Sequence, residues 1–546
     1  MLPIPTLAAI LIFSASALQI LLAFVTRSPL LAVLGGWQLT GLGAALAFTV
    51  PLGARLRNER FELAWWHGRG GKNPGQGGVV VGAPFEIRFG IRNRGFRAVR
   101  LIDLEPQLPE AVRILDFEGG LLTLPPKSHC ELSMTLVAEA AGRMVLQGLA
   151  TSVQGPAGLF LAPIYFPSPL TITVLPRAAA PWHNPFANQG FELAERAGLR
   201  SQKTPGSGTE LHEVREHQSG DPFKSIAWKA SARRGRLMVR EVEREVQETL
   251  YLILDVGGSM RAGEPGKRKL DQALELAARN ARKALAAGDR VGLITVDTRI
   301  LEHIAPGQGL GHMRAIYRAL ISATAVVDAD LSEADAAEVA LRVARYIQSQ
   351  YGIATVHDGE PDMLRVLRHI RSSLPSEATN EVSRRPIVAE DRHDEDLRRF
   401  CLQRGIPLPY RAHRAASEKT AGLVAALSAA AAGGRDPRSL LILSDFDGVA
   451  TGEAWTAALR FALRRHHRPL CVFFDGRELL AATGKGSDRV ERQLRFVYGL
   501  EEERRLQEHR QALGRLGLPL VVHGGGRGAA AGRGAAAGTR APTGQP

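Results

Sequence analysis

Two uncharged, apolar stretches near the N-terminus constrain the fold of this chain more than any other feature. Ala8 to Thr26 is 19 residues long and Leu30 to Val50 is 21 residues long, and neither contains a charged residue. A helix of about 20 apolar residues is long enough to cross the hydrocarbon core of a membrane. The intervening Arg27-Ser28-Pro29 is typical of a tight turn. We therefore expect residues 1–54 to form a transmembrane helical hairpin in contact with a lipid bilayer.

The charges beside these stretches predict their orientation. Arg55, Arg57 and Arg60 follow the second stretch, whereas only Arg27 lies between the two. Since basic residues collect on the cytoplasmic side, the main domains are expected in the cytoplasm. A cleavable signal peptide is the alternative, but the second stretch would still remain as an anchor. A reducing compartment agrees with the three scattered cysteines, Cys130, Cys401 and Cys471.

The positive net charge raises the question of whether the chain binds nucleic acid. Lys and Arg total 69 against 55 for Asp and Glu, which gives a formal net charge of +14. Nucleic-acid grooves combine basic residues with several stacking aromatic residues. In the most basic segment only Phe223 and Trp228 are aromatic, and Glu241, Glu243 and Glu245 interrupt the basic residues. We expect no nucleic-acid partner, and assign the charge to membrane orientation and a partner surface.

The middle of the chain has the pattern of an all-β sandwich. Between 64 and 176, short β-prone runs such as Phe85 to Phe89 and Leu170 to Val174 alternate with turn residues. Period-two alternation with breaks about every ten residues is typical of such a domain. The carboxylates of this region are scattered, which favours a spacer or interaction module. Residues 177–248 follow as a basic connector.

The C-terminal half predicts an α/β doubly wound domain over 249–523. Strand-like runs end at Asp255 and just before Asp445, and helical patterns separate the runs, as at 269–287 and 332–350. Ligands of doubly wound sheets bind beyond the carboxyl ends of the strands, which directs attention to these two aspartates. About 351–439 is interpreted as an insertion with its own helices. The Gly- and Ala-rich tail, 524–546, is expected to be disordered.

The segment from Asp255 to Met260 resembles the DxSxS motif of von Willebrand factor A domains. That resemblance implies a metal-ion-dependent adhesion site for Mg²⁺ or another divalent cation, with Asp255, Ser259, Thr324 and Asp445 as ligands. Gly257 stands where the motif has its first serine, so one hydroxyl ligand is missing. The alternative is a degenerate site, in which the aspartates cap helices or hold loops.

The order of these parts is similar to that of a bacterial membrane protein family called domain of unknown function 58. Its most diagnostic segment here is 208–233, whose signature and expected partner-binding residues are Glu210, Arg215, Asp221, Trp228, Lys229 and Arg233. His217 and Lys224 depart from the family pattern. The resemblance implies partnership with a MoxR-type AAA+ ATPase, in chaperone-like assembly or envelope maintenance at the bacterial inner membrane. We expect an interaction protein, with no catalytic residues and no bound cofactor other than the cation.

An enzymatic alternative comes from the run Leu441 to Val449. Its apolar strand followed by Asp-x-Asp-Gly resembles the first motif of haloacid-dehalogenase-like phosphatases, with Asp445 as the nucleophile and Asp447 as the general acid. Only about one hundred residues follow this motif, although it should open its domain. The interaction protein is therefore the preferred hypothesis.

Overall fold

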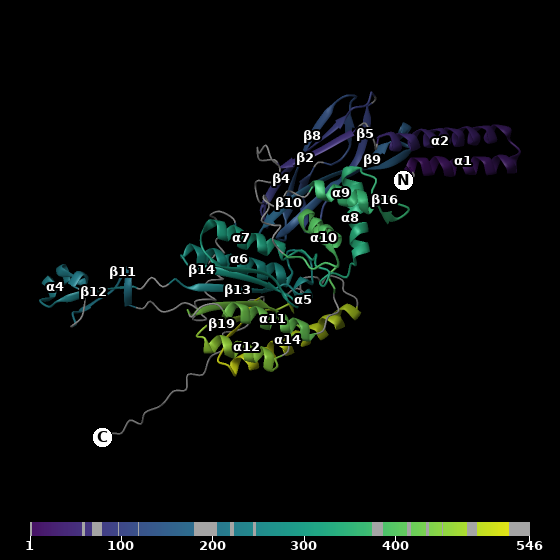
Figure 1. Cartoon of the computed structure of the whole chain (residues 1–546). Coiled ribbons are helices and arrows are strands. Elements are labelled where there is room, and N and C mark those ends of the chain that lie inside the picture. The colour runs from purple at the N-terminus through teal and green to yellow at the C-terminus, as the bar shows by residue number, and fades with distance from the viewer. Residues whose placement is uncertain are drawn as a thin grey trace, which may run out of the picture.

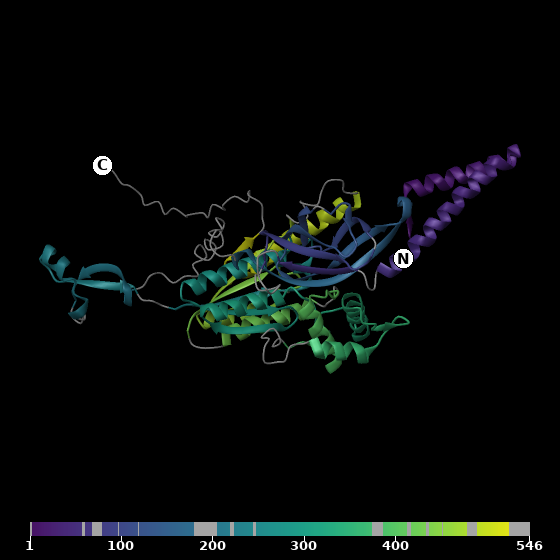
Figure 2. The ribbon, with the colours of Figure 1, turned by 90° about the horizontal axis from the view of Figure 1, so that it is seen from above.

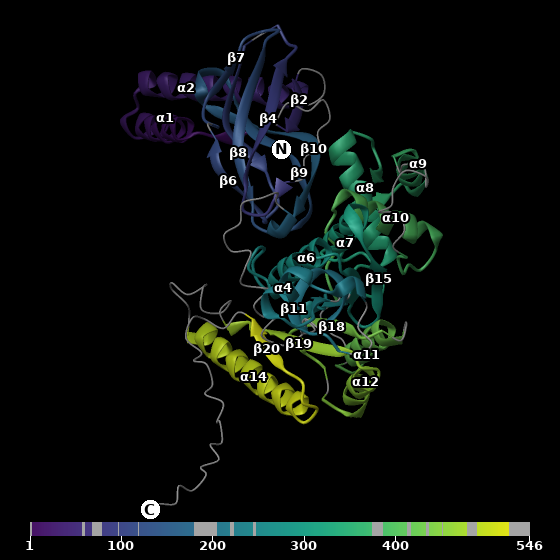
Figure 3. The same cartoon turned by 90° about the vertical axis from the view of Figure 1, so that its left-hand side faces the viewer.

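The computed structural model describes most of the chain (Figures 1, 2 and 3). The described residues are 3–56, 61–67, 79–96, 98–117, 119–179, 205–218, 223–243, 247–373, 386–411, 416–432, 436–449, 451–477 and 489–523. The tail expected to be disordered, 524–546, lies outside these ranges.

Two long helices, α1 (Leu7–Thr26) and α2 (Pro29–Leu56), form an antiparallel pair that projects from the rest of the molecule (Figure 1). Both are long and apolar enough to cross a membrane, which confirms that part of the prediction. The turn forms because Arg27 adopts a left-handed conformation, with φ of 52°. Pro29 then begins α2 at a position where a helix has no use for the missing N–H.

The two apolar helices contact each other through small and polar groups. Ala9 and Ala23 are buried, and the hydroxyl of Ser16 donates a 2.8 Å hydrogen bond to the side chain of Gln38. Large side chains such as Phe24 and Trp37 are exposed on the outside of the pair. Such an arrangement suits helices that meet lipid, because small residues let two backbones approach closely.

A β-sandwich follows, made of two sheets that share one apolar core. The first sheet contains β1 (Ile4–Pro5), β10 (Phe160–Leu175), β9 (Gly142–Gln154), β5 (Val99–Gln107) and β7 (Leu122–Leu124) in this order, with β3 (Val79–Val80) beside β10. The second contains β2 (Phe61–His67), β4 (Pro84–Asn93), β8 (His129–Ala138) and β6 (Val112–Phe117). The alternation expected from the sequence is clear in β4, where Phe85, Ile87, Phe89 and Ile91 all point into the core.

The connector contains a separate small unit. Strands β11 (Pro205–Glu216) and β12 (Met238–Glu243) pair antiparallel, and a 3-10 turn (Phe223–Ser225) and α4 (Trp228–Arg234) lie between them in the sequence. Figures 1 and 2 show this unit standing apart from the sandwich and the α/β domain.

The α/β domain has a six-stranded sheet in the order β15, β14, β13, β18, β19, β20. All neighbouring pairs are parallel except β14 and β15, which are antiparallel. The strands are β13 (Thr249–Asp255), β14 (Arg290–Val296), β15 (Ile300–Gly307), β18 (Arg438–Ser444), β19 (Arg468–Phe474) and β20 (Leu520–His523). The chain runs outward from β13 to one edge and later returns to β18, so the topological switch point lies between β13 and β18.

Helices cover both faces of this sheet (Figures 1 and 3). One apolar core lies under α6 (Lys269–Ala286) and α7 (Gly309–Ser322). The other lies under α11 (Ala416–Ala432), α12 (Glu453–Arg464) and α14 (Arg489–Gly514). The short helix α5 (Gly258–Arg261) directly follows β13.

A unit with its own apolar core interrupts the domain, but its limits differ from the expected 351–439. The core of this inserted unit, residues 327–408, includes α8 (Ala336–Tyr351), α9 (Met363–Ser373) and α10 (Arg392–Arg404). A small hairpin of β16 (Val356–His357) and β17 (Glu360–Pro361) lies beside them. The unit therefore begins before 351, and α11 belongs to the sheet, because Leu423 and Leu427 pack into the core beneath it.

Candidate functional site

Two acidic residues meet at the switch point of the α/β sheet. Asp255 is the last residue of β13, and Asp445 directly follows β18. Both side chains are fully buried. The hydroxyl of Ser444 donates a 2.5 Å hydrogen bond to Oδ2 of Asp255, which ties the two strand ends together. The sequence prediction that these strand ends share a site therefore has a geometric basis in the fold.

An ammonium group lies where the oxygens of this site converge. Nζ of Lys419, from the first turn of α11, is 3.0 Å from Oδ2 of Asp255 and 3.4 Å from Oδ1 of Asp445. It also donates to Oγ of Ser259 at 3.1 Å, and Ser259 donates in turn to Oδ1 of Asp445 at 3.0 Å. The Lys419 side chain is only 12% exposed. The lysine thus binds three of the four residues that the motif resemblance assigned to a cation.

A second buried lysine neutralises the other side of Asp445. Nζ of Lys269, the first residue of α6, is 3.1 Å from Oδ2 of Asp445 and also pairs with Glu502 of α14. It donates to the hydroxyl of Tyr498 at 3.2 Å. The backbone N–H of Gly476 donates to Glu502 as well. We call Asp255, Ser259, Lys269, Lys419, Asp445 and Glu502 the switch-point cluster.

The electrostatics of the cluster follow from burial opposed by pairing. Burial alone would raise the pKa of Asp445, but the ammonium groups of Lys419 and Lys269 hold that pKa below its ordinary value. Burial would likewise lower the pKa of Lys419, yet Asp255 and Asp445 raise it above the ordinary value. The pKa of Lys269 is raised for the same reason, by Asp445 and Glu502. Asp445 and both lysines are therefore charged at neutral pH.

The residues present do not fit a bound divalent cation. The ammonium of Lys419 occupies the point where a cation would meet Asp255, Ser259 and Asp445. A Cβ added at Gly257 would lie 3.3 Å from Nζ of Lys419 and 3.1 Å from Oδ1 of Asp255, so a serine would crowd the lysine. Among the described residues, no group of three or more His, Cys, Asp or Glu side chains is arranged to hold a metal ion.

Thr324 lies away from the switch-point cluster. It follows α7, and its hydroxyl donates to the carbonyl of Ile321 at 2.7 Å. Its own carbonyl accepts a 2.7 Å hydrogen bond from Arg261, and its Oγ1 lies against Gly142 of the sandwich. Of the four predicted ligands, the structure brings together Asp255, Ser259 and Asp445 and leaves Thr324 elsewhere.

The expected partner-binding residues fall in the small unit of the connector. Arg215 lies in β11, where its guanidinium donates to the carbonyl of Glu216 at 3.0 Å. Trp228, Lys229 and Arg233 lie exposed on α4. Asp221 lies outside the described residues; Glu210 belongs to β11, but its side chain is not described.

Sequence reasoning missed the lysines of the cluster. Lys419 lies within the range interpreted as an insertion. Lys269 begins a helix whose amphipathic pattern gave no reason to single out this lysine. The one available signal is that Lys269 precedes Leu270 on the apolar side of an amphipathic helix, where both are buried.

Comparisons with known proteins agree with the family resemblance. The model of a family described as "Protein of unknown function DUF58" matches residues 213–381. Uncharacterized proteins of Mycobacterium bovis and Mycobacterium tuberculosis are each 26% identical to the chain over 172 residues. The match covers 30% of this chain and 52% of each relative, so the chain spans about half the length of the curated relatives that it matches.

Similar solved structures match about a fifth of the chain. A FixG-related protein from Vibrio parahaemolyticus is 8% identical, with a TM-score of 0.14, over 21% of this chain and 97% of that one. The α-2-macroglobulin of Escherichia coli is 13% identical, with a TM-score of 0.17, over 21% of this chain and 16% of that one. Likenesses of this size assign neither a fold nor a function.

Proposed function

We propose that this chain is a membrane-anchored docking protein with a von Willebrand A-like domain, and not an enzyme with its own turnover. Its partner is a MoxR-type AAA+ ATPase, and the pair serves chaperone-like assembly or envelope maintenance at the bacterial inner membrane. The apolar helices α1 and α2 support the anchor. The convergence of Asp255, Ser259 and Asp445 on one point supports the von Willebrand A-like interpretation.

One observation carries the proposal: an exposed aromatic and basic surface on the connector unit. Phe223 is 74% exposed and Trp228 is 57% exposed, and their rings meet edge to face with centroids 5.5 Å apart. We call Phe223, Lys224, Trp228, Lys229 and Arg233 the docking face. Contiguous exposed apolar patches, unlike single exposed residues, mark interaction sites. Trp and Arg are enriched among the residues that dominate binding energy.

The charge of the docking face indicates the chemistry of the partner. From 223 to 240 the sequence has six basic residues, namely Lys224, Lys229, Arg233, Arg234, Arg236 and Arg240, and no acidic one. Opposite charge steers association and favours the matching partner. The proposal therefore requires an acidic surface, with an apolar recess for Trp228, on the ATPase.

The phosphatase alternative lacks a supporting observation. A nucleophilic aspartate needs an oxygen that a phosphate ester can approach. Asp445 is fully buried and both of its oxygens are bonded, to Ser259 on one side and Lys269 on the other. Asp447 pairs with Arg505 at 2.5 Å.

A binding experiment tests the proposal. The full chain in detergent is immobilised and the MoxR-type ATPase of the same organism is passed over it. We expect retention, and we expect Phe223→Ala and Trp228→Ala each to weaken it by at least about tenfold, because loss of a central aromatic residue costs on the order of 2 kcal/mol. The matched control is Phe96→Ala, which removes an equally exposed phenylalanine of the sandwich (78% exposed) and should leave binding unchanged.

Absence of retention, or an equal loss with Phe96→Ala, would contradict the docking proposal. The enzymatic alternative has a separate readout. Phosphate released from p-nitrophenyl phosphate by the wild-type chain, and lost in Asp447→Asn, would favour a phosphatase.

A further inference from the structure

A cavity of about 390 Å³ lies where three parts of the molecule meet. Arg143 of β9 and Thr173 of β10 line it from the sandwich, and Arg261, Arg268 and Arg318 line it from the α/β domain. The inserted unit lines the remaining side with residues between 402 and 408, and Tyr410 follows directly after it. Its volume falls within the roughly 300–1,000 Å³ typical of small-molecule sites.

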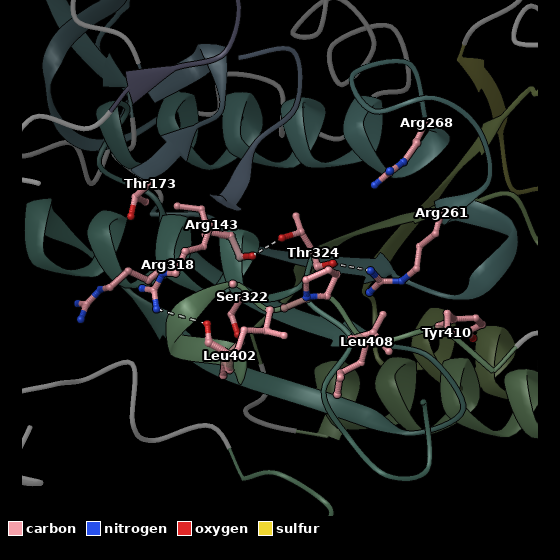
Figure 4. Close-up of a pocket in the computed structure, with 16 residues that line it drawn as sticks. Arg143, Thr173, Arg261, Arg268, Arg318, Ser322, Thr324, Leu402, Leu408 and Tyr410 are labelled. Carbon is pink, nitrogen blue, oxygen red and sulfur yellow. Dashed lines mark hydrogen bonds between the residues drawn. The ribbon is translucent and has the colours of Figure 1, made fainter. Parts of the chain in front are cut away.

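The charge of this cavity has one sign. Four of its lining residues are arginines, and no aspartate or glutamate is among the described residues that line it. Figure 4 shows Arg143 and Arg318 on one side of the drawn residues and Arg261 and Arg268 on the other, with Thr324 between them. A ligand in this cavity would therefore meet guanidinium groups at both ends.

Backbone carbonyls hold two of these arginines in place. Arg261 donates to the carbonyls of Val256, Ala323 and Thr324 at 2.6 to 2.7 Å. Arg143 donates to the carbonyl of Gln403 at 3.1 Å. A carbonyl carries no net charge, so the positive charge stays. Burial lowers the pKa of Arg143, and the nearby Arg404 lowers it further, as expected where cations gather.

The carboxylate of Asp271 lies near this arginine group, but it already accepts other hydrogen bonds. Asp271 accepts hydrogen bonds from the backbone N–H groups of Gly266 and Arg268, at 2.7 and 3.2 Å. It lines a different cavity, on the side of Arg177 and Glu275. Asp271 offsets part of the charge of Arg268 and of Arg261, but it does not line the arginine cavity.

The rest of the lining is apolar. Ile321, Val326, Leu402, Ile406 and Leu408 contribute aliphatic side chains. Half-buried cations beside aliphatic walls suit an anion that carries a carbon skeleton. Arginine recognises phosphate through paired, charge-assisted hydrogen bonds, and several arginines suit an ion with more than one negative charge.

We propose that this cavity binds a small phosphorylated organic molecule, whose phosphate groups pair with Arg143 and Arg268 and whose carbon skeleton packs on the inserted unit. The site is independent of the docking face. Because the ligand contacts the sandwich, the α/β domain and the inserted unit together, its binding holds these three parts in one arrangement.

Calorimetric titration tests the site with inorganic pyrophosphate as the probe, added to the full chain in detergent. We expect saturable binding of one pyrophosphate per chain. Arg143→Gln and Arg268→Gln should each weaken it by about tenfold or more, since each substitution removes a charge-assisted hydrogen bond to the anion. The matched control is Arg504→Gln, which removes an exposed arginine paired with Glu508 on α14 and should bind normally.

Three outcomes would overturn the proposal. They are the absence of saturable binding, an equal loss in Arg504→Gln, and tighter binding of succinate than of pyrophosphate, which would assign the cavity to dicarboxylates. Arg261 is not substituted, because its three carbonyl contacts make it part of the fold. Circular dichroism of each variant shows whether it is folded, and a folded Arg143→Gln chain with wild-type affinity would refute the role of that arginine.

Discussion

At the scale of single residues, the ammonium group of Lys419 takes the place of a divalent cation. Asp255 and Asp445 are too deeply buried to remain charged without a partner, and the lysine supplies a positive charge that belongs to the chain. The missing serine at position 257 then has a physical reason, because its side chain would crowd the ammonium. The cluster therefore needs no divalent ion to hold the strand ends together.

Removing the ammonium group of Lys419 should destabilise the fold and should allow Mg²⁺ to bind in its place. We expect Lys419→Ala to lower the free energy of unfolding by about 3–5 kcal/mol, because one partner of a buried ion pair is lost. Mg²⁺ should restore part of this loss in the variant and leave the thermal midpoint of the wild-type chain unchanged. Differential scanning fluorimetry with Mg²⁺ or with a chelator measures both effects.

The control for this substitution is Lys267→Ala, which breaks an exposed pair with Glu264. Exposed pairs contribute about 1 kcal/mol or less, so this variant should resemble the wild type. A wild-type chain stabilised by Mg²⁺ would show that a metal displaces Lys419, contrary to the structure.

The residues of the switch-point cluster also show which parts of the site can be predicted from the sequence. Asp255 and Asp445 were predictable, since each ends an apolar strand and parallel strands end at one edge. Lys419 was not, because it lies 160 residues from Ser259 and a lysine is ordinarily a solvated surface charge. Thr324 was chosen by position along the chain, but the structure turns it toward the sandwich.

At the scale of elements, α14 fixes a histidine against the loop that carries Asp445. His509 is buried, and its ring lies 4.9 Å from that of Phe446. Burial lowers the pKa of His509 from 6.5 to about 4, so the folded chain holds it neutral. Its contribution to stability is complete above pH 6.5 and is lost as the pH falls toward 4.

Acid should therefore weaken the wild-type chain more than a variant without this histidine. Between pH 7 and pH 5 the free energy of unfolding should fall by about 2 kcal/mol more in the wild type than in His509→Gln. Urea unfolding at the two pH values, followed by tryptophan fluorescence, measures the difference. His393→Gln, at an exposed histidine of α10, should keep the wild-type dependence. An identical pH response of wild type and His509→Gln would exclude this role.

The elements also explain why domain limits were harder to predict than strands. The buried runs of β13 and β18 are continuous apolar segments, which the sequence marks clearly. Helices α8 and α11 both have enough apolar residues to pack against a core. The sequence pattern does not indicate which core each helix packs against. The structure sends α8 to the core of the inserted unit and α11 to the sheet, and this decides where the insertion begins and ends.

At the scale of the whole molecule, the hairpin of α1 and α2 predicts a topology. If the positive-inside rule orients the chain, the turn at Ser28 faces away from the cytoplasm and the sandwich lies inside. In spheroplasts, and in a chain that also carries Cys130→Ser, a membrane-impermeant maleimide should label Ser28→Cys without permeabilisation. It should label Thr123→Cys, on the exposed edge strand β7, only after permeabilisation. The reverse pattern would invert the proposed orientation.

The pairing of β13 with β18 has a consequence for how the chain is made. The hydrogen bond from Ser444 to Asp255 joins residues 189 apart in the sequence. At ribosomal rates of about 5–20 residues per second, β13 leaves the ribosome roughly 10–40 s before its neighbour β18 has been synthesised. During that time an apolar strand edge is open to pairing with other nascent chains. The edge of β13 that later pairs with β18 must therefore stay unpaired until most of the α/β domain has been made.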